Sequence, residues 1–206
     1  MLTFYELAPS PNGLKARLML RYKGVVFETV AVDPNDRASV VEVSGQELTP
    51  VITDKEIVLN DSEAISHYLD ANYRYGPRLW PSDKEGRRAC DRFKSELDQR
   101  IAPAWADVFF HAIKLRETMD PQSPQRFREQ VAWIEEELGK EPGERAWHPA
   151  AINELRLAKW TLYALPGPAL LQRVPLFKRF AELYAIEAGA FPRLEEFLRP
   201  WQEHAS

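Results

Sequence analysis

Three short segments in the first third of the chain carry residues suited to binding an anion and a thiol. Ser10 precedes a proline at the start of a predicted helix, where a hydroxyl and unbonded backbone N–H groups point the same way. Thr49 and Pro50 begin an apolar run, and a proline suits a strand start because it cannot donate within a sheet. Asp61 and Ser62 open a second predicted helix. Together the three segments predict one anion and thiol site.

Composition narrows the classes of protein to consider. The chain has 206 residues and an apolar fraction of 45%, enough for one large domain or two small ones. The net charge of −4 and the lack of a basic block argue against nucleic acid as a partner. The single cysteine, Cys90, excludes a disulfide framework, a Cys-rich metal site and a two-cysteine redox motif, and no metal is expected.

The same reading gives an expected location. No apolar run approaches the roughly 18 residues that a membrane helix needs, so no membrane association is expected. The residues after Met1 predict a strand rather than a signal peptide, which favours a cytoplasmic protein.

The first eighty residues alternate strand and helix patterns in the order βαβ-ββα. Asn60 followed three residues later by Glu63 indicates a capping box at the start of the last helix. The first two strands are expected to be parallel because a helix separates them. The predicted elements are strand Leu2–Tyr5, a helix from Pro11 that stops near Lys23, strand Val25–Val32, at most a short irregular helix within 34–45, strands Val51–Ile52 and Ile57–Leu59, and a final helix.

Strand patterns end after residue 76, and the remainder predicts helices. We expect domains over residues 1–76 and 85–206, with a linker at 77–84 that is rich in glycine and proline. Pro103 is expected to bend or interrupt the first long helix. The predicted helices are Glu85–Arg116, Ser123–Gly139, Ala150–Leu165, Leu176–Ala188 and Phe191–Gln202.

This organisation resembles that of the cytosolic glutathione transferases. The sequence SPNGLKAR at 10–17 resembles the family's active-site turn, especially the Thr-Pro-Asn-Gly form of the Nu class. SGQELTPV at 44–51 resembles the loop that ends in a cis-proline, and LNDSEAI at 59–65 resembles the segment that receives the γ-glutamyl end of glutathione. The resemblance implies an α/β plus all-α fold, with a thioredoxin-like domain followed by a helical bundle.

The resemblance also implies a way to hold the glutathione thiolate. A hydroxyl at a helix N-terminus favours the thiolate through a hydrogen bond and the helix dipole. Ser10 is the first candidate donor, and Asn12 adds an amide donor as the Nu-like form implies. Tyr5 is the second candidate for the hydroxyl. Without the resemblance, Ser10 is simply a helix cap and Tyr5 a residue of the core or its rim.

The other contacts to glutathione follow from the same resemblance. A cis bond at Pro50 would let the Thr49 backbone pair with the cysteinyl part of the ligand. Ser62 would hold the γ-glutamyl carboxylate, and Asp61 would face its ammonium group.

The glycyl carboxylate has no evident partner in the sequence. Glu47 and Leu48 precede Thr49, where many relatives carry a basic residue. Gln46, Arg37 and Lys15 remain as candidates for that contact.

Three functions stay open at this point. The first is a glutathione-dependent enzyme that attacks a small hydrophobic electrophile or a disulfide, acting as a homodimer. The second is a non-catalytic protein that binds apolar ligands, and the third is a module that presents its surface to a protein partner. Aromatic residues of the helical half, which serve as core or substrate contacts, are Trp105, Phe109, Phe110, Trp160 and Tyr163.

Overall fold

A computed structural model describes residues 1–8, 10–165, 180 and 182–205. The chain divides into two compact units, Met1–Pro81 (unit 1) and Ser82–Ser206 (unit 2). Within the described residues, no helix combines the length and the apolar character that crossing a membrane requires.

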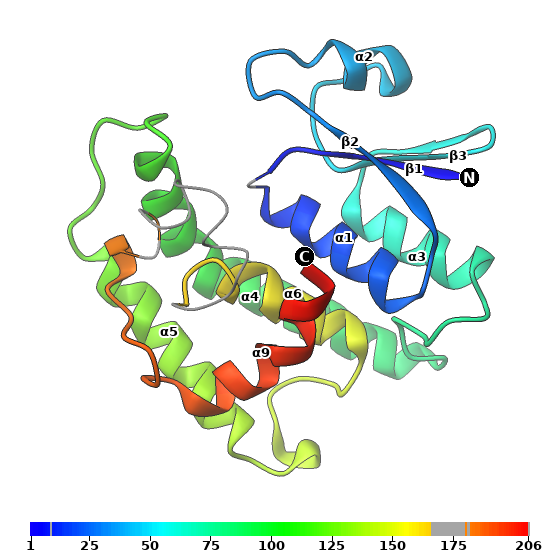
Figure 1. Cartoon of the computed structure of the whole chain (residues 1–206). Helices are drawn as coiled ribbons and strands as arrows, with labels where there is room; N and C mark the ends of the chain where they lie inside the picture. The colour runs from blue at the N-terminus through cyan, green and yellow to red at the C-terminus, as the bar shows by residue number, and fades with distance from the viewer. Residues whose placement is uncertain (9, 166–179, 181, 206) are drawn as a thin grey trace. The chain divides into compact units, whose positions relative to one another are not determined.

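Unit 1 is built on a four-stranded sheet in the order β2-β1-β3-β4. β1 runs parallel to β2 and antiparallel to β3, and β3 and β4 form a hairpin. The predicted βαβ-ββα order and the thioredoxin-like fold are confirmed (Figure 1). The elements are β1 (Leu2–Glu6), α1 (Pro11–Tyr22), β2 (Phe27–Ala31), α2 (Ala38–Ser44), β3 (Val51–Asp54), β4 (Ile57–Leu59) and α3 (Ser62–Asn72).

The sheet of unit 1 is covered on both faces, as Figure 1 shows. Leu2 and Phe4 of β1 are buried. Tyr5 alternates with them along β1 and packs on the opposite face against a cluster that includes Val40 of α2 and Val51. This alternation explains why a strand of five residues anchors both layers.

The start of β2 differs from the sequence prediction. β2 begins at Phe27, so Val25 and Val26 lie before the strand although their β-branched side chains favour one. The short helix expected within 34–45 is present as α2, a regular α-helix of seven residues, and it ends at Gly45, whose φ of 71° suits a glycine.

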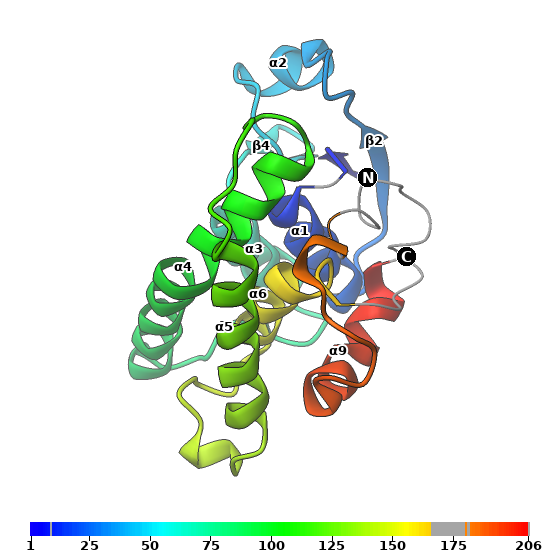
Figure 2. The same cartoon turned by 90° about the vertical axis from the view of Figure 1, so that its left-hand side faces the viewer.

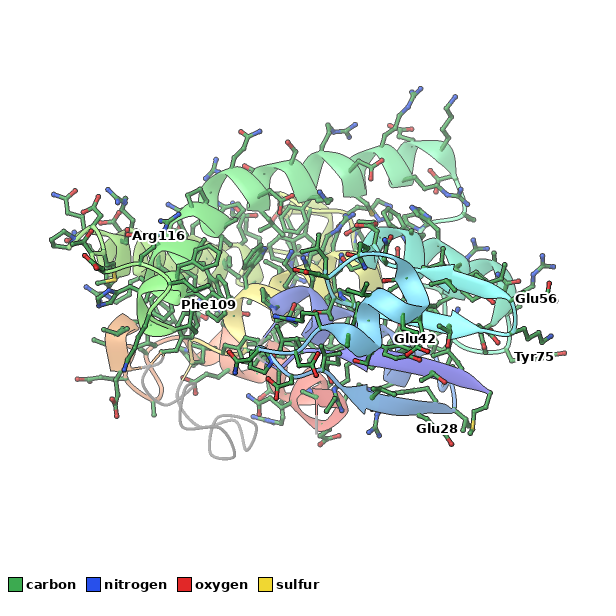
Figure 3. The ribbon with its side chains drawn as sticks, turned by 90° about the horizontal axis from the view of Figure 1, so that it is seen from above. Glu28, Glu42, Glu56, Tyr75, Phe109 and Arg116 are labelled. Carbon is green, nitrogen blue, oxygen red and sulfur yellow. The ribbon has the colours of Figure 1, made fainter. Side chains whose placement is uncertain are left out.

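Unit 2 consists of helices. Figure 2 shows α4 and α5 side by side. Figure 3 labels Phe109 on α4 and Arg116 in the segment that follows this helix. The described elements are α4 (Lys84–Ala112), α5 (Ser123–Leu138), the 3-10 turn η1 (Pro142–Glu144), α6 (Ala151–Thr161) and α9 (Pro192–Ala205).

The predicted helices of unit 2 are largely confirmed, with differences in α4 and α6. α4 ends at Ala112, four residues before the predicted end. α4 continues through Pro103, so the predicted interruption is wrong; the proline lies on an exposed side of the helix. α6 ends at Thr161, four residues before the predicted end. The predicted helix Leu176–Ala188 lies partly outside the described residues.

Buried polar contacts hold α6 against α4. Ala150 caps α6 without a side-chain hydrogen bond, and Asn153 is a fully buried polar residue of the first turn. Its amide donates to the His148 carbonyl at 2.9 Å and to Cys90 Sγ at 3.4 Å. Arg156 donates to the Cys90 carbonyl at 2.6 Å. These contacts fix the first two turns of α6 against α4.

Candidate functional site

The strand register brings the three predicted segments to one edge of the sheet. Tyr5, near the end of β1, pairs with Val51 at the start of β3. Ile52 of β3 pairs with Leu59 at the end of β4. The turn after β1, the loop before β3 and the turn after β4 therefore leave the sheet at the same edge. These are the segments that contain Ser10, Thr49–Pro50 and Asp61–Ser62.

Ser10 caps α1. Its Oγ accepts the Gly13 N–H at 3.1 Å, and its backbone N–H donates to the Leu7 carbonyl at 2.8 Å. A Cβ on Gly13 would lie 3.3 Å from Ser10 Cβ, so the glycine allows a close approach. A hydroxyl that accepts one bond still has its own hydrogen to donate. The geometry thus leaves Ser10 able to donate to an anion at the start of α1.

An ion pair holds the two elements on either side of this turn. Arg17, in the second turn of α1, donates through Nε to Glu6 Oε1 at 3.2 Å, and its Nη2 contacts Glu6 Oε2. Two parallel N–H···O contacts fix a guanidinium against a carboxylate in orientation as well as in distance. The turn that carries Ser10 is therefore fixed at both ends.

The other two predicted thiolate donors lie in different surroundings. Asn12 is exposed on the first turn of α1, and its amide makes no hydrogen bond with a described residue. Tyr5 is half-buried and packs against Val32, Val40 and Val51. Its ring thus belongs to the apolar cluster on the α2 face of the sheet.

The Thr49–Pro50 peptide bond is cis, as the resemblance implied. Pro50 is buried and Thr49 is half-buried. The loop before them is organised by Gln46, whose amide donates to Ser44 Oγ and to the Leu48 carbonyl, both at 2.9 Å, and accepts the Leu48 N–H at 2.6 Å. Both ends of the Gln46 amide are thus engaged within its own loop.

Asp61 caps α3, so the predicted capping box with Asn60 as its first residue is wrong. Asp61 Oδ1 accepts the N–H groups of Glu63 at 2.9 Å and Ala64 at 2.8 Å. Asn60 lies one residue too early to reach them. Ser62 is the first residue of the helix and only 6% exposed, while Asp61 is exposed. A carboxylate at a helix start also interacts favourably with the helix dipole.

The three candidates for the glycyl carboxylate have different surroundings. The Gln46 amide is engaged in its loop, as described above. Lys15 is buried, and its Nζ contacts Glu63 Oε1 on α3. Arg37 is half-exposed at the start of α2, and its guanidinium forms no hydrogen bond or ion pair with a described residue. Arg37 is therefore the candidate whose charge stays available to a ligand.

The aromatic residues of unit 2 form a packed group. Trp105 is buried, stacks on Phe109 with ring centroids 4.7 Å apart, and meets Trp160 edge-on at 5.1 Å. Tyr163 is also buried, whereas Phe109 and Phe110 are half-exposed. Packing explains the buried members, and the two phenylalanines remain accessible for contact with a ligand. His111 lies in the last turn of α4.

Sequence reasoning missed two ion pairs made by α1, Lys15–Glu63 and Arg17–Glu6. Lys15 lies between Leu14 and Ala16, both of which are buried, and a charged residue in such a stretch is a signal that a partner is needed. The partner itself, Glu63, is 48 residues away. Among the described residues, no group of three or more His, Cys, Asp or Glu side chains comes together as a metal site would require.

Comparisons with known proteins agree with this architecture. Residues 4–78 match the family model of the glutathione S-transferase N-terminal domain. A probable glutathione S-transferase from Oryza sativa subsp. japonica is 25% identical over 107 residues, covering 49% of this chain and 45% of that protein. A stringent starvation protein A homolog from Coxiella burnetii is 26% identical over 116 residues, covering 56% and 51%. The matched part of the chain spans about half the length of either curated relative.

Solved structures resemble the whole chain at lower identity. An epsilon-class glutathione S-transferase from the housefly, Musca domestica, has a TM-score of 0.72 and 19% identity, covering 100% of this chain and 92% of that one. Ure2p in complex with glutathione has a TM-score of 0.69 and 17% identity, covering 99% and 92%. At these identities, the likeness shows the shared fold of both units.

Proposed function

Residues 4–78 match the glutathione S-transferase N-terminal domain, and we propose that the chain is a glutathione transferase-like protein that binds glutathione in unit 1 and presents its thiolate to a second substrate. A free thiol has a pKa of about 8.5, so a protein that uses the thiolate at neutral pH must favour that form. The single observation that carries the proposal is the position of Ser10. Its Oγ accepts the Gly13 N–H, which orients the hydroxyl at the start of α1 with a hydrogen left to donate.

The remaining contacts to glutathione are assigned by the chemistry of each side chain. Ser62 and the N–H groups at the start of α3 suit the γ-glutamyl carboxylate, and Asp61 suits the ammonium group. The backbone of Thr49, before Pro50, suits the cysteinyl part of the ligand. Gln46 shapes the loop that presents this backbone.

Two further residues complete the proposed site. Arg37 is the cation proposed for the glycyl carboxylate. Asn12 is exposed beside Ser10 and supplies an amide donor near the sulfur.

In the proposed reaction, the thiolate attacks an electrophilic carbon, a carbon–sulfur bond forms and the leaving group departs with its electron pair. With a disulfide as substrate, the thiolate attacks one sulfur and the other leaves as a thiolate. The resemblance of residues 10–13 to the Nu-class turn is the reason that the disulfide reaction is included as a close variant. The second substrate in this proposal is a small hydrophobic electrophile or a disulfide. A cytoplasmic location belongs to the same proposal, since reduced glutathione needs a reducing compartment. A homodimer is proposed on the resemblance alone.

A second function is favoured by one feature of the loop before Pro50. Glu47 and Leu48 are exposed there. The negative charge of Glu47 would repel the glycyl carboxylate of glutathione and weaken its binding. One curated relative is named as a transferase and the other as a stringent starvation protein A homolog. A non-catalytic protein that binds an apolar ligand or a protein partner is therefore the alternative.

Titration of the protein with reduced and oxidised glutathione separates the two functions. We expect saturable binding by calorimetry at or below millimolar ligand, and ultraviolet absorbance of bound thiolate at neutral pH. The matched control is Arg37→Met, which should weaken binding without changing the thiolate signal per bound ligand. Failure to bind at millimolar concentration would favour the non-catalytic alternative.

A further inference from the structure

Lys15 is a buried charge in the helix that starts at Ser10. Only 2% of this lysine is exposed, although it lies on the second turn of α1. A buried ammonium group must be compensated by an opposite charge and by hydrogen bonds. Its Nζ contacts Glu63 Oε1, and the Glu63 side chain is 21% exposed. The pair therefore lies at the boundary between the interior of unit 1 and solvent.

The position of this pair relates the two halves of the proposed site. Lys15 follows Ser10 by five residues on α1. Glu63 follows Ser62 directly on the first turn of α3. Figure 1 shows these two helices on the same face of the sheet. The ion pair thus joins the second turn of α1, the helix capped by Ser10, to the first turn of α3, the helix that carries the proposed γ-glutamyl contacts.

We propose that Lys15 and Glu63 are positioning residues that set the spacing between Ser10 and the Asp61–Ser62 turn. This inference rests on the proposed function. A ligand held at its sulfur and at its γ-glutamyl end gains affinity from the second contact only when both contacts are reached in one conformation. The ion pair keeps the two helix starts at that spacing before the ligand arrives.

The pair Arg17–Glu6 provides the internal comparison. It joins α1 to the end of β1 and makes no link to α3. Its side chains are 22% and 11% exposed, so it is also partly buried. Loss of this pair changes the Ser10 turn and leaves the spacing to α3 under the control of Lys15 and Glu63. Loss of Lys15–Glu63 should therefore weaken the binding of a ligand that reaches α3 more than that of a shorter one, whereas loss of Arg17–Glu6 should affect both ligands alike.

The test compares glutathione with cysteinylglycine, which has the thiol and the glycyl end but no γ-glutamyl group. Dissociation constants for both ligands and the midpoint of thermal unfolding are measured for wild type, Lys15→Met, Glu63→Gln, the double variant Lys15→Met/Glu63→Leu and the control Arg17→Met. The quantity of interest is the dissociation constant of cysteinylglycine divided by that of glutathione. General destabilisation weakens the binding of both ligands alike and leaves this ratio unchanged.

We expect Lys15→Met and Glu63→Gln each to weaken glutathione by about tenfold, with a change below about twofold for cysteinylglycine. The double variant removes both charges, so its unfolding midpoint should return toward that of wild type while its ratio stays low. Arg17→Met should keep the wild-type ratio. If a single variant fails to fold, the double variant carries the test.

Three results would overturn the inference while leaving thiol binding in place. If the single and double variants all keep the wild-type ratio, the pair is purely structural. The pair is also purely structural if the single variants lower the ratio but the double variant regains both the wild-type ratio and the wild-type unfolding midpoint. Equal affinity of the wild type for both ligands would remove the γ-glutamyl advantage while leaving thiol binding in place. A wild type that binds neither ligand would instead reject the proposed function, and this inference with it.

Discussion

Lys23 Nζ lies 2.9 Å from Asp70 Oδ1 in the interior of unit 1. The same carboxylate accepts the backbone N–H groups of Leu79 at 3.0 Å and Trp80 at 2.9 Å. Lys23 also donates to the Pro77 carbonyl at 3.1 Å. One buried carboxylate therefore ties the end of α1 and the segment after α3 together.

Asp70 should make the stability of unit 1 depend on acid pH. Burial opposes its ionisation, but hydrogen bonds from Leu79, Lys23 and Trp80 outweigh that effect and lower its pKa below the ordinary 3.8. A lowered folded-state pKa gives stability that is complete above the unfolded value and is lost as pH falls through the folded one. Urea unfolding should therefore show a loss of stability below about pH 4 that Asp70→Asn lacks.

The Asp70→Asn variant should also lose about 3 kcal/mol at pH 7, because Lys23 then lacks its buried counter-charge. The exposed pair Lys94–Asp98 is the matched control, and Asp98→Asn should change stability by less than about 1 kcal/mol. An acid profile shared by Asp70→Asn and wild type would contradict this role.

Two tyrosines should make unit 1 sensitive to alkaline pH. Tyr68 and Tyr73 both donate to Asp54 Oδ2, at 2.9 and 2.5 Å. Burial, and then the hydrogen bond and charge of Asp54, raise the pKa of Tyr68 from 10.0 to about 12. The same causes raise the pKa of Tyr73 further.

A raised folded-state pKa gives stability that is complete below the unfolded value and is lost as pH rises through the folded one. Spectrophotometric titration should show a tyrosine that ionises near the pKa of about 12, with stability falling from pH 10 upward. Tyr68→Phe should remove this titration and cost about 1 kcal/mol at pH 7. Ionisation of every tyrosine near 10 in the folded protein would argue against the Asp54 contacts.

Ser10→Ala should reduce thiol transfer far more than glutathione binding. The variant loses a hydrogen-bond donor to the thiolate, which should lower kcat/KM by about 10- to 100-fold. It also loses the helix cap, at a cost of about 1 kcal/mol in stability. Steady-state kinetics, calorimetry and unfolding measure the three effects.

Ser10→Thr keeps the hydroxyl and should retain most of the activity. Asp83→Ala is a control for the loss of a cap, because Asp83 caps α4 through Gly86 N–H at 2.7 Å and belongs to unit 2. Turnover by Ser10→Ala equal to that of wild type would reject the role of the hydroxyl.

Gly76→Ala should destabilise unit 1. A Cβ at this position would lie 2.3 Å from the Lys23 carbonyl oxygen and 2.9 Å from the Lys23 carbonyl carbon, so the backbone would have to move. We expect a loss of about 1–3 kcal/mol by urea unfolding. Gly143→Ala is the control, since its Cβ would meet nothing within 4 Å and should change stability by less than about 0.5 kcal/mol.

Local patterns predicted the elements that carry the site. Proline at the first position of α1 marked its start, and Lys23 next to Gly24 marked its end, because both effects act within one turn of helix. The pattern of Asn60 and Glu63 predicted the wrong cap for α3, because Asn60 and Asp61 are both good capping residues. The backbone path after β4 puts Asp61 within reach of the N–H groups of Glu63 and Ala64.

The contacts between distant residues could not be predicted in the same way. Lys15 and Glu63 meet because α1 and α3 pack on one face of the sheet, and the sequence pattern of either helix does not specify that register. Likewise, the polar composition of residues 44–48 indicated a loop without showing that Gln46 would use its whole amide inside it. The fold followed from local signals, whereas these side-chain partners depend on tertiary packing.

The sole thiol of the chain, Cys90, is completely enclosed within unit 2. A water-soluble disulfide reagent can modify it only when the helices around it separate. The rate of that modification under native conditions therefore measures how often unit 2 opens. Because unit 1, which carries Ser10, has no cysteine, this rate does not report local motions within unit 1.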